Sequence, residues 1–140
     1  MKVSEAMTAQ VVTATPETTI TEVAKTMARI ESGAVPVVDG GKVVGLVTDR
    51  DLVIRVVAEG GSLSQPVRDV MSEVVETCRE EDNLADAAAA MAARQIRRLV
   101  VLNEAGRLVG ILSLGDIATD YGAKVVGQTL EEISAAPATH

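Results

Sequence analysis

Hydrophobic residues follow first a helical and then a strand-like spacing in the first half of the chain. The apolar positions that recur every three or four residues, as on a helix with one apolar face, are Ile20, Val23, Ala24, Met27 and Ile30. Two valine-rich runs follow, 35–38 and 43–47, and a glycine-rich turn at 39–41 joins them. The pattern predicts a helix followed by a β-hairpin.

The same pattern returns in the second half, so the chain contains an internal repeat. Thr19 and Asn83 begin the two predicted helices, each with an acidic residue three positions later as in a capping box, at an offset of 64 residues. The offset becomes 65 after the second hairpin turn, and turns are where folded chains accept an extra residue. Each copy is predicted to hold a helical turn, a short strand (11–13 or 74–77), a helix, a hairpin (second copy 99–102 and 108–112) and a last helix (49–59 or 114–121).

This duplication divides the chain into repeat 1 (1–62), repeat 2 (63–122) and a C-terminal part (123–140). In the last part, Thr129 and Glu132 open a short helix that is either a docking element or a frayed tail. A domain of about 60 residues buries only about 60% of its unfolded surface, so neither repeat is expected to be stable alone. We therefore expect an α/β fold of the α+β type in which the repeats share one core about a pseudo-twofold axis.

A hydroxyl–carboxylate segment recurs at the end of each hairpin. It consists of a glycine, two aliphatic residues, a hydroxyl residue, two variable positions and an aspartate. The hydroxyl residue and the aspartate are Thr48 and Asp51 in one copy, and Ser113 and Asp116 in the other. One interpretation is a helix capping box. The other is a ligand site, in which the hydroxyl and helix start bind phosphate, the carboxylate binds a ribose diol, and the glycine lets the ligand approach the backbone.

The doubled pattern resembles the pair of cystathionine-β-synthase (CBS) domains called a Bateman module. The resemblance is carried by residues 3–8, 13–16, 33–37 and 45–51, and by 67–72, 96–101 and 110–116. It implies two β-α-β-β-α repeats packed sheet to sheet, with adenosine nucleotides or related adenosyl ligands bound in the clefts between them.

By position, the resemblance implies a set of ligand-binding residues. Asp51 and Asp116 would bind ribose, Thr48 and Ser113 ribose or phosphate, and Arg97 and Arg98 phosphate. Short strands and hairpin starts would line the adenine slot, at Thr13, Ala14, Ala34, Val35, Thr77, Cys78, Arg98 and Leu99. Because the first repeat has Gly33 and Ala34 where the second has two arginines, the two sites are expected to be unequal. The arginines could equally be a solvated strand edge.

Composition excludes several functions. Thirteen Lys+Arg against twenty Asp+Glu give a net charge of −7, which disfavours nucleic acid and anionic membranes as partners. Tyr121 is the single aromatic residue and His140 the single histidine, so base stacking, a histidine general base and Cys/His metal sites are not expected. The longest apolar run, 87–93, is too short for a membrane span. One cysteine, Cys78, fits a reducing, cytoplasmic location and is expected to be a small buried residue.

Together these features predict a non-catalytic regulatory protein. It would bind AMP, ADP, ATP or a related adenosyl molecule without an obligatory cofactor or metal, form a homodimer, and signal ligand occupancy to an unknown protein partner. The alternative is a structural or dimerisation scaffold with vestigial clefts, and an enzyme comes third. Four methionines at repeat-equivalent positions are expected to be packing residues: Met7, Met27, Met71 and Met91.

Overall fold

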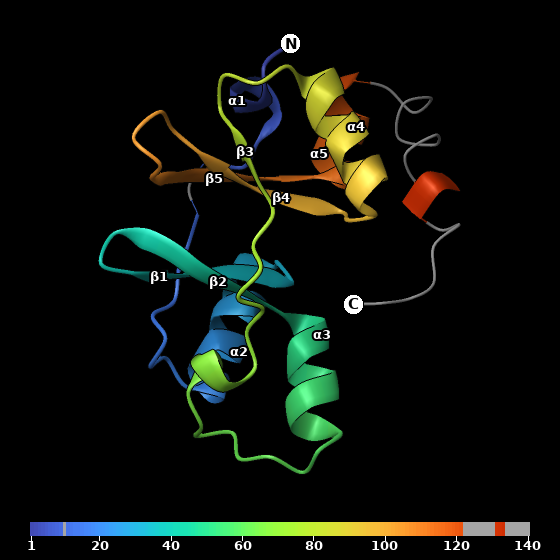
Figure 1. Cartoon of the computed structure of the whole chain (residues 1–140). Coiled ribbons are helices and arrows are strands. Elements are labelled where there is room, and N and C mark those ends of the chain that lie inside the picture. Colours follow the sequence, from blue (N-terminus) through green and yellow to red (C-terminus); the bar gives the residue numbers. More distant parts are fainter. Residues whose placement is uncertain (10, 122–130, 134–140) are drawn as a thin grey trace. The chain divides into compact units, whose positions relative to one another are not determined.

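The computed structural model describes residues 1–9, 11–121 and 131–133, which form two compact units (Figure 1). Unit 1 combines Met1–Gln10 with Glu76–His140, and unit 2 is Val11–Val75. The units therefore cross the repeat boundaries expected from the sequence. Each unit contains the hairpin of one repeat and the opening segment of the other.

Unit 2 is a two-stranded sheet with helices against one face (Figure 1). Helix α2 (Ile20–Ile30) is followed by strands β1 (Ala34–Asp39) and β2 (Lys42–Thr48), helix α3 (Asp49–Leu52), the π-helical segment η1 (Val53–Val57) and the 3-10 turn η2 (Val67–Asp69). The two strands are antiparallel. A core forms where the sheet meets the helices, and its fully buried members include Val23, Val35, Val37, Val47, Val56 and Val67.

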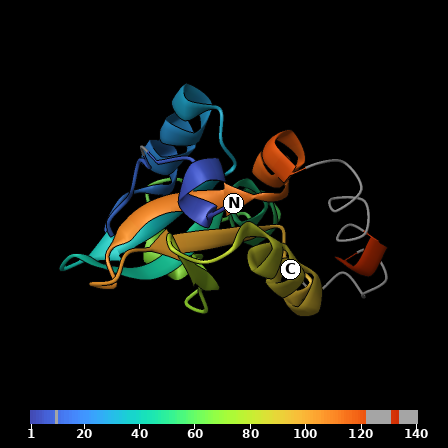
Figure 2. The ribbon, with the colours of Figure 1, turned by 90° about the horizontal axis from the view of Figure 1, so that it is seen from above.

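Unit 1 has one more strand and a fuller helical cover. It contains α1 (Val3–Ala6), β3 (Thr77–Arg79), α4 (Leu84–Arg94), β4 (Arg98–Leu102), β5 (Leu108–Ser113) and α5 (Leu114–Tyr121). Strand β3 is parallel to β4, which is antiparallel to β5. Figure 2 looks down on α1, α4 and α5, which lie over the sheet of this unit. Ile133 is buried against the same core, whereas Thr129, predicted to open the last helix, lies outside the described residues.

Both hairpins and the helices that precede them are confirmed, with one exception on α2. Thr19 caps α2 by accepting the N–H of Glu22 at 3.2 Å, and Asn83 caps α4 by accepting the N–H of Ala85 at 2.8 Å. Ala24, expected on the apolar stripe, is exposed. The buried stripe is narrower than predicted and is formed by Ile20, Val23 and Met27.

Both predicted short strands differ from the observed ones, and in unit 2 two prolines explain the difference. In unit 1 the strand begins at Thr77, not at residue 74, and bonds from Val100 N–H to Glu76 O and from Glu80 N–H to Leu102 O flank it. The equivalent donors in unit 2 are Pro36 and Pro16, which have no N–H. Only a single parallel bridge between Ala14 and Val37 remains there, so the predicted strand at 11–13 does not form.

The last helix of repeat 1 changes its hydrogen-bond pattern part-way. After four α-helical residues it widens, and Ala58 N–H bonds to Val53 O at 2.9 Å, a five-residue step. Beyond it, Gly61 N–H bonds to Val56 O at 2.8 Å with the same spacing. The region is rich in β-branched residues, which weakens the preference for a regular α-helix. The predicted helix is therefore present, but it ends at Val57 and its second half is π-helical.

In each unit a methionine packs on a glycine of the hairpin. The methionine belongs to the exchanged segment, which is the opening segment that the other repeat contributes to the unit. A Cβ at Gly110 would lie 2.5 Å from Met7 Sδ and 2.9 Å from the Thr8 carbonyl oxygen. In unit 2, Gly45 meets Met71 Sδ in the same way, at 2.5 Å. The suggestion that these glycines leave room for a ligand is therefore wrong, because the space above them holds the methionine of the incoming segment.

Gly110→Ala should destabilise the protein by about 1–3 kcal/mol, because the added methyl group overpacks a site where backbone as well as sulfur lies too close. Gly115→Ala is the matched control. Its Cβ would lie 3.6 Å from the nearest atom, Ser113 Oγ, in a helix, so a gain of about 0.5–1 kcal/mol is expected. Urea unfolding measures both, and equal stability of the two variants would contradict this account of the glycine.

Candidate functional site

In unit 2 the hydroxyl–carboxylate pair lies where β2 runs directly into α3. Thr48 keeps extended backbone angles and acts as the N-cap. Its N–H and Oγ1 both donate to Asp51 Oδ2, at 2.9 and 3.0 Å, while Asp51 N–H donates back to Thr48 Oγ1 at 3.2 Å. The capping-box interpretation is thus confirmed for the first pair.

In unit 1 the second pair repeats this arrangement at the start of α5. Ser113 N–H donates to Asp116 Oδ2 at 2.9 Å, and Asp116 N–H donates to Ser113 Oγ at 3.2 Å. Among the described residues, no hydrogen bond or ion pair reaches Asp116 Oδ1. One oxygen of the carboxylate therefore forms the cap, and the other remains an acceptor for a further donor. Capping and ligand binding are compatible roles for the same side chain.

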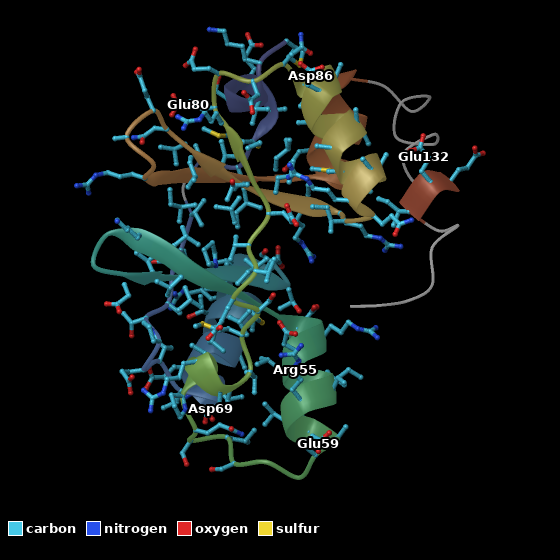
Figure 3. The ribbon with its side chains drawn as sticks, viewed as in Figure 1. Arg55, Glu59, Asp69, Glu80, Asp86 and Glu132 are labelled. Carbon is cyan, nitrogen blue, oxygen red and sulfur yellow. The ribbon has the colours of Figure 1, made fainter. Side chains whose placement is uncertain are left out.

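Arg55 is a member of the unit 2 site that the sequence analysis missed. Its Nε lies 3.8 Å from Asp51 Oδ1, and its Nη1 donates to the Val70 carbonyl oxygen at 3.3 Å (Figure 3). The guanidinium thus connects the carboxylate to the exchanged segment that follows η2. The signal was present in the sequence as a four-residue spacing on a helix, the spacing of a helical ion pair. Repeat 2 has Asp120 at this position.

The start of each hairpin lies beside the hydroxyl–carboxylate pair. Ala34 is opposite Thr48 in the β1–β2 register, and Arg98 is opposite Ser113 in the β4–β5 register. The structure therefore brings the predicted residues at positions 34, 48 and 51 together, and likewise those at 98, 113 and 116. Val35 and Leu99 are fully buried, so they can offer a ligand only their backbone.

Arg97 and Arg98 are both exposed at the beginning of β4. Within the part of the chain that the structure describes, neither guanidinium forms a hydrogen bond or ion pair. The main-chain carbonyl of Arg97 accepts the N–H of Leu114, the first residue of α5, at 3.1 Å. Both arginines therefore start next to the turn that holds Ser113 and Asp116, and their charge is available there.

The strand residues predicted to line an adenine slot lie further along each sheet. Ala14 pairs with Val37, and Cys78 pairs with Val101. Each is three strand positions, or about 10 Å, from the hairpin start of its own unit. The neighbouring Thr13 and Thr77 are exposed, whereas Ala14 is buried. The predicted residues are thus spread over neighbouring strands in each unit and do not form a single cluster.

Cys78 is a half-buried thiol that packs against the core of unit 1. The pKa of the Cys78 thiol is raised to about 11, chiefly by burial and also by the nearby Asp82 carboxylate, while Arg94 partly opposes both. A thiol of such high pKa is protonated at neutral pH and is a poor nucleophile or metal ligand. The expectation that Cys78 is a packing residue agrees with this environment.

The described ranges contain neither a metal-binding cluster nor a membrane-spanning helix. No group of three His, Cys, Asp or Glu side chains in residues 1–9, 11–121 and 131–133 is placed to hold a metal ion. Likewise, no helix in those ranges combines the length and apolar character needed to cross a membrane.

Comparison with known proteins decides the family. The family model for the CBS domain matches residues 3–58 and again residues 67–122. The chain belongs to the CBS domain family. The CBS domain-containing protein YhcV of Bacillus subtilis is 40% identical over 133 residues, with 94% of each chain covered. This confirms the resemblance inferred from the duplicated motifs, and the mixed helix and strand content of both units agrees with the α+β fold of CBS pairs.

Two solved CBS structures are informative because of what they contain. The CBS domain protein PAE2072 from Pyrobaculum aerophilum, complexed with AMP, is 28% identical with a TM-score of 0.78, covering 97% of this chain and 100% of that one. The CBS domain pair of protein MJ0100, in complex with 5′-methylthioadenosine and S-adenosyl-L-methionine, is 26% identical with a TM-score of 0.78, covering 87% and 100%. These ligands are properties of the two relatives.

Alkylation of Cys78 should be slow at pH 8 and should accelerate up to a midpoint near pH 11. At pH 8 a thiol of pKa about 11 is only about one part in a thousand thiolate, against about one part in ten for a pKa of 9.0. Asp82→Asn should lower the midpoint because it removes a negative charge, and Arg94→Gln should raise it. The midpoint is read from iodoacetamide rates across pH, and opposite shifts would show that another group controls the thiol.

Proposed function

We propose that this CBS-pair protein is a non-catalytic regulator that binds an adenosine nucleotide or a related adenosyl ligand at its two hydroxyl–carboxylate pairs. The observation that carries the proposal is the unused acceptor capacity of the paired carboxylates. Asp116 Oδ1 has no partner among the described residues, and Asp51 Oδ1 has only the Arg55 guanidinium at 3.8 Å. Two ribose hydroxyls are suitable donors to such an oxygen.

The surrounding groups support the same ligand class. Exposed arginines lie beside one pair and suit phosphate oxygens. The exposed hydroxyls of Thr13 and Thr77 supply hydrogen-bonding groups further along each sheet, next to Ala14 and Cys78, whose backbone is paired with the neighbouring strand. The AMP, methylthioadenosine and S-adenosylmethionine complexes of two relatives make an adenosyl ligand the first class to test.

Regulation would follow from a difference in affinity. A ligand that binds one conformation of the module more tightly shifts the population toward it, and a protein partner that distinguishes the conformations responds. Asp51 is linked through Arg55 to the Val70 carbonyl, so a ligand on this carboxylate acts next to the exchanged segment. We place the protein in the cytoplasm, where a single cysteine stays reduced.

A homodimer is part of the proposal, and one surface favours it. Val53, Ile54 and Val57 on η1 are exposed by 56, 49 and 67%, an unusual concentration of large apolar side chains in one helical turn. If η1 of a second copy packed against η1 of the first, the exposed apolar side chains of both copies would be buried. The alternative function, a dimerisation scaffold with vestigial sites, would use this surface and leave both carboxylates without a ligand.

Ligand binding should appear as thermal stabilisation. AMP, ADP, ATP, S-adenosylmethionine and 5′-methylthioadenosine are tested by differential scanning fluorimetry, and a ligand at 100 times its Kd should add about 2.7 kcal/mol and raise Tm by several degrees. Asp51→Asn and Asp116→Asn keep a capping oxygen but lose the charge, so each should weaken its site about 10- to 100-fold.

Asp86→Asn on the exposed start of α4 is the control variant for these measurements and should bind like the parent protein (Figure 3). Absence of stabilisation by every compound would favour the scaffold. Turnover of a nucleotide by the purified protein would contradict a non-catalytic role.

The dimer is tested by light scattering coupled to size-exclusion chromatography. Ile54→Glu together with Val57→Glu should give the mass of a single chain, because two buried charges at the interface are costly. Val74 is an exposed apolar residue outside η1, so Val74→Glu is the matched control and should leave the dimer intact. A parent protein that is already monomeric, or a double variant that remains dimeric, would exclude this surface as the interface.

A further inference from the structure

We infer that the two sites sort adenosyl ligands by charge. The Asp116 site of unit 1 takes a phosphorylated nucleotide, the Asp51 site of unit 2 takes an adenosyl ligand without phosphate, and Asp49 is the residue that sets the difference. The inference rests on the proposed function and assigns a ligand class to each of its sites.

The Asp116 site has two cationic side chains and no anionic one at the hairpin start. The Arg97 carbonyl accepts Leu114 N–H at 3.1 Å, and Arg98 pairs with Ser113 across the sheet. Both guanidinium groups are exposed and lack partners among the described residues. Arginine recognises phosphate through paired charge-assisted hydrogen bonds, so these two side chains are the candidates to bind a phosphate next to Ser113.

The Asp51 site has the equivalent main-chain hydrogen bond, but the side chain beside that bond is acidic and not basic. Here the N–H of Asp49 donates to the Gly33 carbonyl at 2.9 Å, as Leu114 does to Arg97 in the other unit. An ideal Cβ at Gly33 would lie 2.6 Å from Asp49 Oδ2 and 2.9 Å from Oδ1. The Asp49 carboxylate therefore occupies the space that the Cβ atom of an arginine at position 33 would need.

Two sequence differences thus act in the same direction. Relative to repeat 2, repeat 1 replaces an arginine by Gly33 and a leucine by Asp49, which removes a positive charge and adds a negative one at the same contact. A phosphate placed there would meet a carboxylate of like charge, and such juxtapositions are strongly disfavoured. A neutral thioether nucleoside or a cationic sulfonium meets no such repulsion.

Arg55 does not restore a phosphate site at this position. Arg55 contacts Asp51 Oδ1 and the Val70 carbonyl, so its charge is directed at the ribose-binding carboxylate and the exchanged segment. Arg50 follows Asp49 in the chain, and its N–H donates to Asp49 Oδ1 at 2.9 Å. That bond fixes the Asp49 carboxylate at the start of the helix, against Gly33.

Isothermal titration of the full chain with AMP and with 5′-methylthioadenosine tests the assignment. AMP should bind one site per chain and should lose affinity at least tenfold in Asp116→Asn but not in Asp51→Asn. Methylthioadenosine should bind a site that Asp51→Asn weakens at least tenfold. Arg97→Gln together with Arg98→Gln should weaken AMP at least tenfold and leave the Asp51-dependent binding of methylthioadenosine unchanged.

Asp49→Asn is the decisive variant, because it removes the charge and keeps an oxygen for the N–H of Arg50. It should raise the number of AMP sites from one to two per chain. Asp39→Asn in the exposed hairpin turn is the control and should keep one AMP site. Urea unfolding of each variant establishes that it is folded before its binding is interpreted.

The outcomes separate this inference from the function on which it rests. If both compounds bind but AMP already fills two sites in the parent protein, or depends on Asp51, or is unaffected by Asp49→Asn, the sorting by charge is wrong and the proposed function stands. If neither compound binds, and neither ADP, ATP nor S-adenosylmethionine does, the proposed function fails and the inference fails with it.

Discussion

The packing of one methionine on one glycine in each unit is the contact on which the rest of the structure depends. It joins a segment from one repeat to the hairpin of the other, at Met7 on Gly110 and at Met71 on Gly45. Next to it, backbone pairs Thr8–Ile111 and Ser72–Leu46 continue the sheet of each unit. Because the same glycine lies three residues before the hydroxyl of the hydroxyl–carboxylate pair, on the strand that ends there, packing of the exchanged segment and placement of the site are linked through a few residues of backbone.

The paired carboxylates show how one side chain can serve both fold and function. Each uses Oδ2 to fix the junction between a strand and a helix, and this fixes the direction of Oδ1. A ligand acceptor held by a cap is already oriented before any ligand arrives, so little side-chain entropy is lost on binding. The two units differ in what surrounds this shared arrangement: an arginine ion pair and an acidic neighbour in one, and in the other two arginines whose side chains have no partner among the described residues.

Local patterns in the sequence were enough to predict the hairpins, the long helices and the capping boxes at the starts of α3 and α5, since each depends on residues close together in the chain. The exchange of segments could not be read this way, because a repeat pattern does not reveal which copy a flanking segment packs on. The lost strand beside Ala14 was accessible in principle, since Pro16 and Pro36 lie at the two missing donor positions. The contact between Arg55 and Val70 required the fold, because it joins residues that only tertiary structure brings together.

The division of the chain between units also orders its folding. Unit 2 is continuous in sequence, so all of its parts are available once residue 75 has left the ribosome, whereas unit 1 combines a segment made before unit 2 with a stretch made after it. The opening segment must therefore wait, with Val3 and Ala6 unburied, until β4, β5 and α5 exist to receive it. A destabilising substitution at Val3 or Ala6 would consequently damage the unit that holds the second hairpin more than the repeat that it precedes.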